Sequence, residues 1–189
     1  CARGCLFGRI YAAAVIYPKE VLKDKKIENL INDSKKLTPK KRELIYNYLK
    51  DNLIYGVGYL ENTDIDKYGI QHCNFQAIHI ALNIVNNTFD KILVDGKYFE
   101  DYYKDNIKID HECIIKGDSK YFSIACASII AKVEHDNYIK KLVLENPILD
   151  KYCLLSNMGY GTKNHIVAIK NYGYTDYHRK SYKIKQLTN

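Results

Sequence analysis

The sequence predicts a mixed α/β fold. Short apolar runs of strand length alternate along the chain with longer segments that carry apolar residues at helical spacing. No internal repeat, low-complexity segment or linker interrupts this alternation, and 189 residues suit one domain with a single core. We therefore expect residues 1–189 to form one α/β domain of a soluble globular protein, in keeping with 47% hydrophobic and 27% charged residues.

The first predicted elements are a strand and a helix. Residues 10–17 (IYAAAVIY) form a compact, partly β-branched apolar run that Pro18 ends, which is typical of a buried strand. Thr38 and Pro39 are a preferred N-cap and first helical residue. A helix is therefore expected over residues 39–51.

A second strand and two helices are expected next. Residues 52–61 (NLIYGVGYLE) predict the strand, and Gly56 and Gly58 within it allow a neighbouring element to approach closely. A short helix is expected over 63–68 and a longer one over 74–86, where apolar residues recur at helical spacing.

Strands and helices continue to alternate in the second half of the chain. Residues 91–95 (KILVD) and 111–116 (HECIIK) predict short buried strands. Residues 123–144 predict a long helix rich in Ala and Ile, and helical signals return at 163–172. The small residues of segment 123–132 suit a helix that packs closely on its neighbours, so we interpret this helix as scaffold.

The net charge of +7 favours a polyanionic partner, because each phosphate contact releases condensed counterions. The basic residues are concentrated before and at the start of the helix at 39–51. They are Lys23, Lys25, Lys26, Lys35, Lys36, Lys40, Lys41 and Arg42. A solvated loop and helix start would have the same composition, so the charge alone leaves the question open.

Cysteine spacing and hydropathy exclude several classes of protein. The six cysteines form no C-x-x-C pair and no zinc-ligand spacing with the six histidines. Their scatter along a chain of this length argues against a disulfide framework, and we expect several in the core. No segment approaches the roughly 18 to 20 apolar residues of a membrane span, and the start is unlike a secretory signal.

Two carboxylates follow predicted strands. Asp95 ends the strand at 91–95 and precedes Gly96, and Asp118 comes just after the strand at 111–116. If these strands are neighbours, both side chains could converge on a hard cation such as Mg²⁺, which takes oxygen ligands. The structural alternatives are a turn residue for Asp95 and an N-cap for Asp118.

Asp136 is excluded as a third ligand by distance. It lies eighteen positions beyond Asp118, and a continuous helical path at about 1.5 Å per residue separates the two by roughly 20 Å or more. We expect Asp136 to be an ion-pair partner near the far end of the helix.

Tyr160 stands between Gly159 and Gly161 in a predicted loop. A ring on flexible, uncrowded backbone suits stacking on a sugar or base. Among 18 tyrosines, however, packing is the ordinary role.

Six segments, in this order along the chain, resemble the motifs of type 2 ribonucleases H. They are Asp-Ser-Lys-Lys-Leu at 33–37, Val-Asp-Gly at 94–96, Lys-Gly-Asp-Ser at 116–119, Ser-Ile-Ala-Cys-Ala-Ser-Ile-Ile-Ala-Lys-Val at 123–133, Gly-Tyr-Gly-Thr at 159–162 and His-Arg-Lys-Ser-Tyr at 178–182. Each motif alone is weak, whereas their order is specific, and the resemblance covers practically the whole chain. It implies a ribonuclease H-like fold, with a central mixed sheet flanked by helices and a helical C-terminal part.

The resemblance also implies a metal site. The family uses four carboxylates around Mg²⁺ or Mn²⁺, and motif matching makes Asp95 the third and Asp118 the fourth. These two are therefore the expected catalytic and metal-binding residues. Two-metal hydrolysis suits them, because one ion helps to generate hydroxide and the other stabilises the leaving oxygen.

Four residues are expected to bind the substrate on the same ground. Arg3 and Gly4 resemble the rest of the loop that reads the 2′-hydroxyl, the group that distinguishes RNA from DNA. Tyr160 resembles the tyrosine that stacks on the sugar next to the ribonucleotide. Lys35 resembles a lysine that contacts backbone phosphate.

The chain departs from the family's pattern at its start. The family opens with Asp-Glu, two small residues and Arg-Gly, and Cys1-Ala2-Arg3-Gly4 matches only the last four positions of this pattern. We therefore expect the chain to be truncated just after an Asp-Glu pair that carries the first two ligands. Ala2 also replaces a glycine of the loop, and Tyr182 replaces a usual Phe.

The implied function is that of a metal-dependent ribonuclease H. It would hydrolyse the phosphodiester 5′ to ribonucleotides in RNA–DNA hybrids and at single ribonucleotides embedded in duplex DNA. We expect these nucleic acids as partners, no membrane, and a monomer in the cytoplasm, or in the nucleus or a viral factory for a eukaryotic or viral source. One alternative is a non-catalytic relative that binds hybrids and has lost its metal site. The other is a type 1 ribonuclease H or a resolvase, which lack the segments at 33–37 and 159–162.

Overall fold

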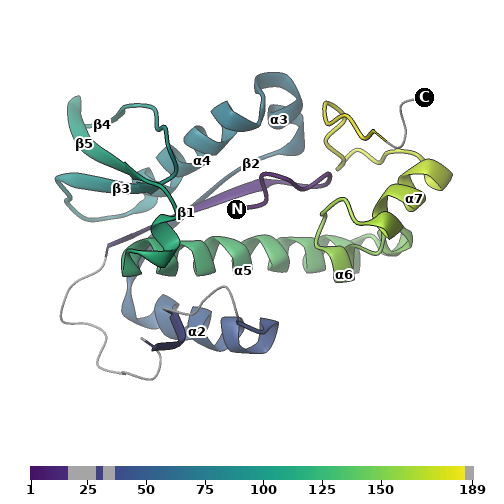
Figure 1. Cartoon of the computed structure of the whole chain (residues 1–189), viewed down its shortest axis with the longest axis horizontal. Helices are drawn as coiled ribbons and strands as arrows, with labels where there is room; N and C mark the ends of the chain where they lie inside the picture. Colours follow the sequence, from purple (N-terminus) through teal and green to yellow (C-terminus); the bar gives the residue numbers. More distant parts are fainter. Residues whose placement is uncertain (17–28, 32–36, 186–189) are drawn as a thin grey trace.

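The computed structural model describes residues 1–16, 29–31 and 37–185, and it confirms the mixed α/β fold (Figure 1). Its strands are β1 (Ile10–Ile16), β2 (Ile54–Leu60), β3 (Lys91–Asp95), β4 (Tyr102–Lys104) and β5 (Ile107–Ile114). The α-helices of at least four residues are α2 (Pro39–Asn52), α3 (Asn62–Tyr68), α4 (Ile70–Ile84), α5 (Phe122–Glu145), α6 (Leu154–Asn157) and α7 (Lys163–Tyr172), and 3₁₀ helices cover Gly117–Ser119 and Pro147–Tyr152. Among the described residues, no helix is long and apolar enough to cross a membrane.

The strands form two sheets. β1 pairs antiparallel with β2, from Ile10 opposite Leu60 to Ile16 opposite Ile54. β5 is the middle strand of the second sheet, with β3 parallel on one side and β4 antiparallel on the other. Within the described part of the chain no ladder joins β1 to β3, so the expected central sheet is divided into two parts.

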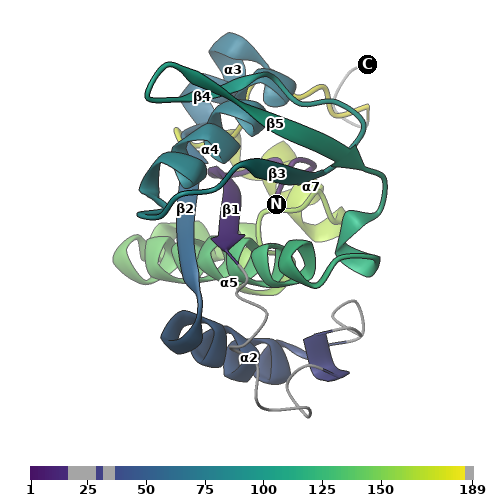
Figure 2. The same ribbon diagram turned by 90° about the vertical axis from the view of Figure 1, so that its left-hand side faces the viewer.

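Helices cover both faces of the β1–β2 sheet (Figures 1 and 2). Ile10 and Ala12 of β1 pack with residues of α3 and α4, whereas Ala13 and Val15 pack with residues of α2 and α5. This alternation follows from the two-residue period of a strand. α2 begins as expected at Pro39, because Thr38 caps it by accepting a hydrogen bond from the Lys41 N–H at 3.4 Å.

Gly56 and Gly58 allow the close packing that the sequence predicts. A Cβ atom at Gly56 would lie 2.1 Å from the Ala81 carbonyl oxygen, and one at Gly58 would lie 2.1 Å from that of Ala77. Both oxygens belong to the backbone of α4, which cannot yield as a side chain can. α4 therefore rests directly on β2.

The largest differences from the predicted boundaries, of four residues each, are at the starts of α4 and β5. α4 begins at Ile70 and not at 74, because Gly69, with a φ of 82°, lets the chain turn straight from α3 into α4. β5 covers 107–114 and not 111–116. It belongs to a hairpin with β4 that the sequence analysis missed, in which Asp105 and Asn106 form a two-residue turn with φ values of 51° and 63°.

The first residues of the chain pack with the last ones. Phe7 is fully buried in one apolar cluster with residues from the C-terminal half of α5 and from the segments that follow it. The other members of its buried core are Ile139, Leu142, Val143, Leu149, Tyr152, Leu154, Ala168, Ile169 and Ile184. The cluster fixes the N-terminal loop against α6 and α7.

We predict that Gly58→Ala destabilises the fold. Because the new Cβ would collide with backbone of α4, the helix must shift, and the free energy of unfolding should fall by about 1–3 kcal/mol. Urea unfolding would measure the loss. Gly4→Ala is the matched control, because nothing lies within 4 Å of a Cβ at Gly4. Equal stability of the two variants would contradict the prediction.

Candidate active site

Asp95 and Asp118 are brought to the same end of one strand pair. Asp95 is the last residue of β3 and lies opposite Ile114 of the parallel strand β5. Its Oδ1 accepts a hydrogen bond from the N–H of Gly117 at 2.8 Å. Asp118 is the next residue, in a 3₁₀ turn at Gly117–Ser119. The two strands are therefore neighbours, as the carboxylate hypothesis requires.

Gly117 is closely surrounded at this point. A Cβ at this position would lie 2.7 Å from Cδ1 of Ile124 and 3.5 Å from Oδ1 of Asp95. Asp118 is not the N-cap of the following helix, because Tyr121 occupies that position. The structural alternative for Asp118 is thus wrong.

The donor set suits a hard cation but is small. Carboxylate oxygens are the ligands that Mg²⁺ and Mn²⁺ prefer. Among the described residues, however, no group of three or more His, Cys, Asp or Glu side chains is placed to hold a metal ion. Asp95 and Asp118 can therefore supply only part of a coordination shell.

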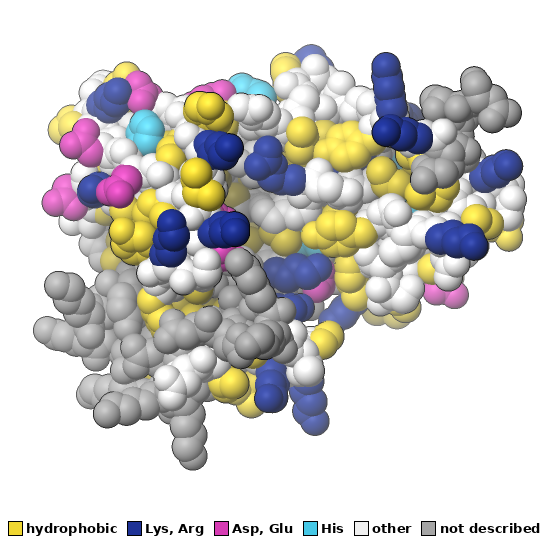
Figure 3. Space-filling model, viewed as in Figure 1, with side chains coloured by type: hydrophobic (Ala, Val, Ile, Leu, Met, Phe, Trp, Pro, Cys, Tyr) yellow, Lys and Arg dark blue, Asp and Glu magenta, His cyan; other side chains and the backbone are white. Residues whose placement is uncertain are grey.

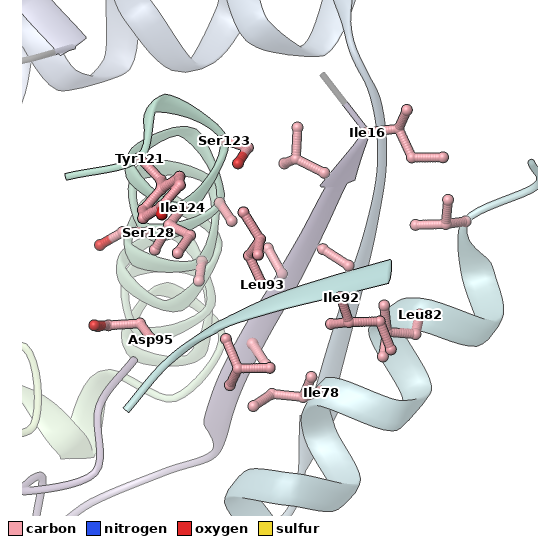
Figure 4. Close-up of a pocket in the computed structure, with 18 of the residues that line it drawn as sticks. Ile16, Ile78, Leu82, Ile92, Leu93, Asp95, Tyr121, Ser123, Ile124 and Ser128 are labelled. Atoms are coloured by element: carbon pink, nitrogen blue, oxygen red, sulfur yellow. The ribbon is translucent and has the colours of Figure 1, made fainter. Parts of the chain in front are cut away.

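A cavity of about 860 Å³ lies between β1 and β3 (Figure 4). One wall is β1 from Ala12 to Ile16, and another is β3 from Lys91 to Asp95. α4 and α5 complete the lining, with Ile78 and Leu82 from the first helix and Ser128 and Lys132 among the residues from the second. The edges of β1 and β3 that border the cavity pair with no other strand in the described part of the chain.

Cys1 lies at one end of this cavity. Cys1 and Tyr11 exchange two backbone hydrogen bonds, of 2.6 Å from the Cys1 amino group and 3.4 Å from the Tyr11 N–H. Such an exchange is the pattern of an antiparallel pair.

Arg3 and Gly4 are exposed next to the cavity, whereas Ala2 between Cys1 and Arg3 is buried. Ala2 has a φ of 63°, in the left-handed region that glycine adopts more easily. Arg3 and Cys1 also line the cavity that contains Asp95. The expected substrate loop therefore borders the expected metal site.

Tyr160 is 38% exposed and lies on the same side as this loop, because Cys5 and Tyr160 form an isolated antiparallel bridge. The surrounding backbone is crowded, so our prediction of an uncrowded loop is wrong. A Cβ at Gly159 would lie 3.0 Å from the Phe7 carbonyl oxygen, and one at Gly161 would lie 2.9 Å from Leu6. The glycines admit a neighbouring segment and thereby fix the ring.

Asp136 belongs to an ion pair, as expected, but in the middle of α5 and not near its end. Its Oδ1 lies 2.8 Å from Nζ of Lys132 and 3.1 Å from Nδ1 of His135. Burial opposes ionisation of Asp136, yet hydrogen bonds from His135 and Lys132 hold its pKa below the usual range.

Lys132 is a site residue that the sequence analysis missed. It lines the cavity with Asp95, and its ammonium lies 5.3 Å from the centre of the Tyr160 ring. The four-residue spacing from Lys132 to Asp136 was the feature of the sequence that could have indicated this ion pair.

Lys35, which we expected to contact phosphate, lies outside the described residues. Figure 3 shows further Lys and Arg side chains gathered around the middle of one face of the molecule.

Comparisons with known proteins agree on one family. The Ribonuclease HII family matches residues 1–185. The ribonuclease HII of Christiangramia forsetii is 44% identical over 183 residues, which cover 96% of this chain and 86% of that protein.

Solved structures share the fold. The ribonuclease H2 from Pyrococcus horikoshii OT3 is 24% identical, with a TM-score of 0.77 over 97% of this chain and 90% of its own. The crystal structure of Bst-RNase HIII in complex with Mn²⁺ is 19% identical, with a TM-score of 0.63 over 90% of this chain and 59% of its own.

Proposed function

This chain belongs to the ribonuclease HII family and is a ribonuclease H endonuclease, and we propose that Asp95 and Asp118 are ligands of its catalytic metal ions. The observation that carries this proposal is the hydrogen bond from Gly117 to Asp95, which holds the two carboxylates at one end of the β3–β5 pair. The family is metal-dependent, and the oxygen donors favour Mg²⁺ or Mn²⁺. Bound there, two such ions would supply hydroxide and stabilise the leaving oxygen.

The residues of the chain would place the substrate beside these carboxylates. Ribonucleases H act on RNA–DNA hybrids, and we propose that this one cuts 5′ to ribonucleotides, including a single one in duplex DNA. Arg3 and Gly4 would lie against the 2′-hydroxyl, and the ring of Tyr160 against the adjoining sugar. Lys132, held by Asp136, adds positive charge at this border. We further propose that the protein is a monomer and that it acts in the cytoplasm. The proposed location agrees with the bacterial origin of its relatives.

We also propose that an acidic pair stands directly before Cys1. A chain continuing backwards from Cys1 would extend its antiparallel pairing with Tyr11 along the edge of β1. It would run parallel to β3 and meet Asp95 at the Cys1 end of the cavity. The edge of β1 that lines the cavity, from Ala12 to Ile16, is five residues long, so a segment of roughly 17 Å could pair along it. Its last two residues would supply the carboxylates that the described residues do not.

The acidic pair separates the enzyme from a non-catalytic relative. We predict that the codons before Cys1 encode Asp-Glu, and that the chain extended through them nicks a duplex with one ribonucleotide in Mg²⁺ or Mn²⁺. The same extension with Asn-Gln should bind but not cut, because amides are weaker ligands for hard cations. Binding without cleavage by the Asp-Glu form would instead identify a relative that has lost its chemistry.

Asp95→Asn should abolish metal-dependent cleavage in the extended chain and leave the fold intact. The amide oxygen still accepts from Gly117, whereas the negative charge of the proposed ligand is lost. Cleavage assays and calorimetric Mn²⁺ titration would test both effects. Asp110→Asn is the matched control, because this carboxylate lies at the opposite end of the same strand pair, facing Lys91. Full turnover by Asp95→Asn would refute the assignment.

Tyr160→Ala should weaken the preference for ribonucleotide junctions more than it weakens binding to DNA. A stacked ring contributes about 1–3 kcal/mol, so the preference should fall by about tenfold. Tyr160→Phe keeps the ring and should keep the preference. Tyr103→Ala removes another exposed ring, on β4, and controls for general loss of aromatic surface. An unchanged preference in Tyr160→Ala would exclude stacking.

A further inference from the structure

We propose that Arg179 positions the backbone of residues 2–4 so that the N–H groups of Arg3 and Gly4 face the 2′-hydroxyl of the substrate. Arg179 would then set the discrimination between RNA and DNA without touching the nucleic acid. The inference rests on the proposed substrate, and it adds to the proposed binding site a residue from the other end of the chain.

Arg179 is buried, with 1% of its surface exposed, and its guanidinium is directed at the N-terminal loop. Nε donates to the Gly8 carbonyl at 2.9 Å, and Nη2 donates to the Arg9 carbonyl at 2.8 Å. Nη1 donates to the Ala2 carbonyl at 2.8 Å and to the Arg3 carbonyl at 3.2 Å. One side chain therefore holds both ends of the loop.

The chemistry of this contact requires arginine. A guanidinium presents five N–H donors in a rigid plane, whereas a lysine ammonium presents three donors on a single atom. A lysine at 179 cannot reach Ala2 and Arg9 in the same way. The burial of a charge is expensive unless hydrogen bonds satisfy it, so the loop has one strongly favoured conformation.

The direction of the carbonyls determines the direction of the amides. In a trans peptide the C=O of one residue and the N–H of the next point to opposite sides of the chain. Because the carbonyls of Ala2 and Arg3 point at Arg179, the N–H groups of Arg3 and Gly4 point away from it. Within the described part of the chain neither amide donates a backbone hydrogen bond, and both residues are exposed.

The space in front of these amides is open. A Cβ at Gly4 would have no neighbour within 4 Å, so the protein itself does not require glycine there. A ligand that approaches the Gly4 backbone closely would require it. Two adjacent N–H donors on open backbone suit an oxygen that accepts hydrogen bonds, and a 2′-hydroxyl is such a group.

Both departures from the family's pattern meet at this contact. Ala2 adopts a positive φ that costs a non-glycine residue about 1–2 kcal/mol, and Arg179 binds its carbonyl. The Tyr182 hydroxyl donates to the Arg3 carbonyl at 2.6 Å and accepts from Nη1 of Arg179 at 3.3 Å. A phenylalanine at 182 would lack this second support for the loop.

The test compares affinities for two duplexes that differ by one 2′-hydroxyl, measured by fluorescence anisotropy without metal. We expect Arg179→Lys to lower the ratio of the two affinities by about tenfold, which corresponds to about 1.4 kcal/mol. The affinity for the all-DNA duplex should change less than twofold, because the net charge is kept. Tyr182→Phe should lower the ratio by about threefold.

Tyr152→Phe is the stability control. It removes a hydrogen bond from the Tyr152 hydroxyl to the Gly173 carbonyl in the C-terminal cluster, so it should cost stability without moving the ratio. A ratio kept within twofold by folded Arg179→Lys would overturn the inference. If that variant fails to fold, an unchanged ratio in Tyr182→Phe would do so. No discrimination by the unmutated chain would instead overturn the proposed reading of the 2′-hydroxyl.

Discussion

The proposed substrate side of this molecule depends on one constraint, the buried attachment of the N-terminal loop to the C-terminal segment. Antiparallel bridges join Cys5 to Tyr160 and Phe7 to His178, and the Arg179 guanidinium binds the loop next to these bridges. The attachment brings Tyr160 next to Cys5, two residues after Arg3. Without it, neither would have a fixed position relative to the carboxylates on β3 and β5.

The carboxylate side depends on a different and simpler constraint. Parallel strands end at the same edge of a sheet, so a carboxylate at the end of β3 and another just beyond β5 are close together by topology alone. Lys116, with a φ of 56°, precedes the turn from which the Gly117 N–H reaches Asp95. The cavity beside this edge borders both parts of the site, since Asp95, Arg3 and Cys1 all line it.

The features that the sequence predicted best are those that depend on interactions between residues close together in the chain. Thr38 and Pro39 mark the start of α2 because a cap is a local hydrogen bond, and KILVD marks β3 because a buried strand is a local apolar run. The β4–β5 hairpin was missed, since three residues of strand give too weak a pattern. The crowding around Gly159 and the role of Arg179 were missed for another reason: their partners lie more than 150 residues away, and no local pattern reports them.

The two halves of the proposed site also differ in the length of chain that each contact must close. Asp95 and Gly117 are 22 positions apart, so this half of the site closes a short loop of chain. Arg179 and Ala2 are 177 positions apart, and a contact across nearly the whole chain carries the largest entropic cost of closure. We therefore expect the contact between Gly117 and Asp95 to form earlier in folding than the contact between Arg179 and Ala2. A chain that lacked its last residues would keep the contact between Gly117 and Asp95 and lose the one that fixes the loop at Ala2.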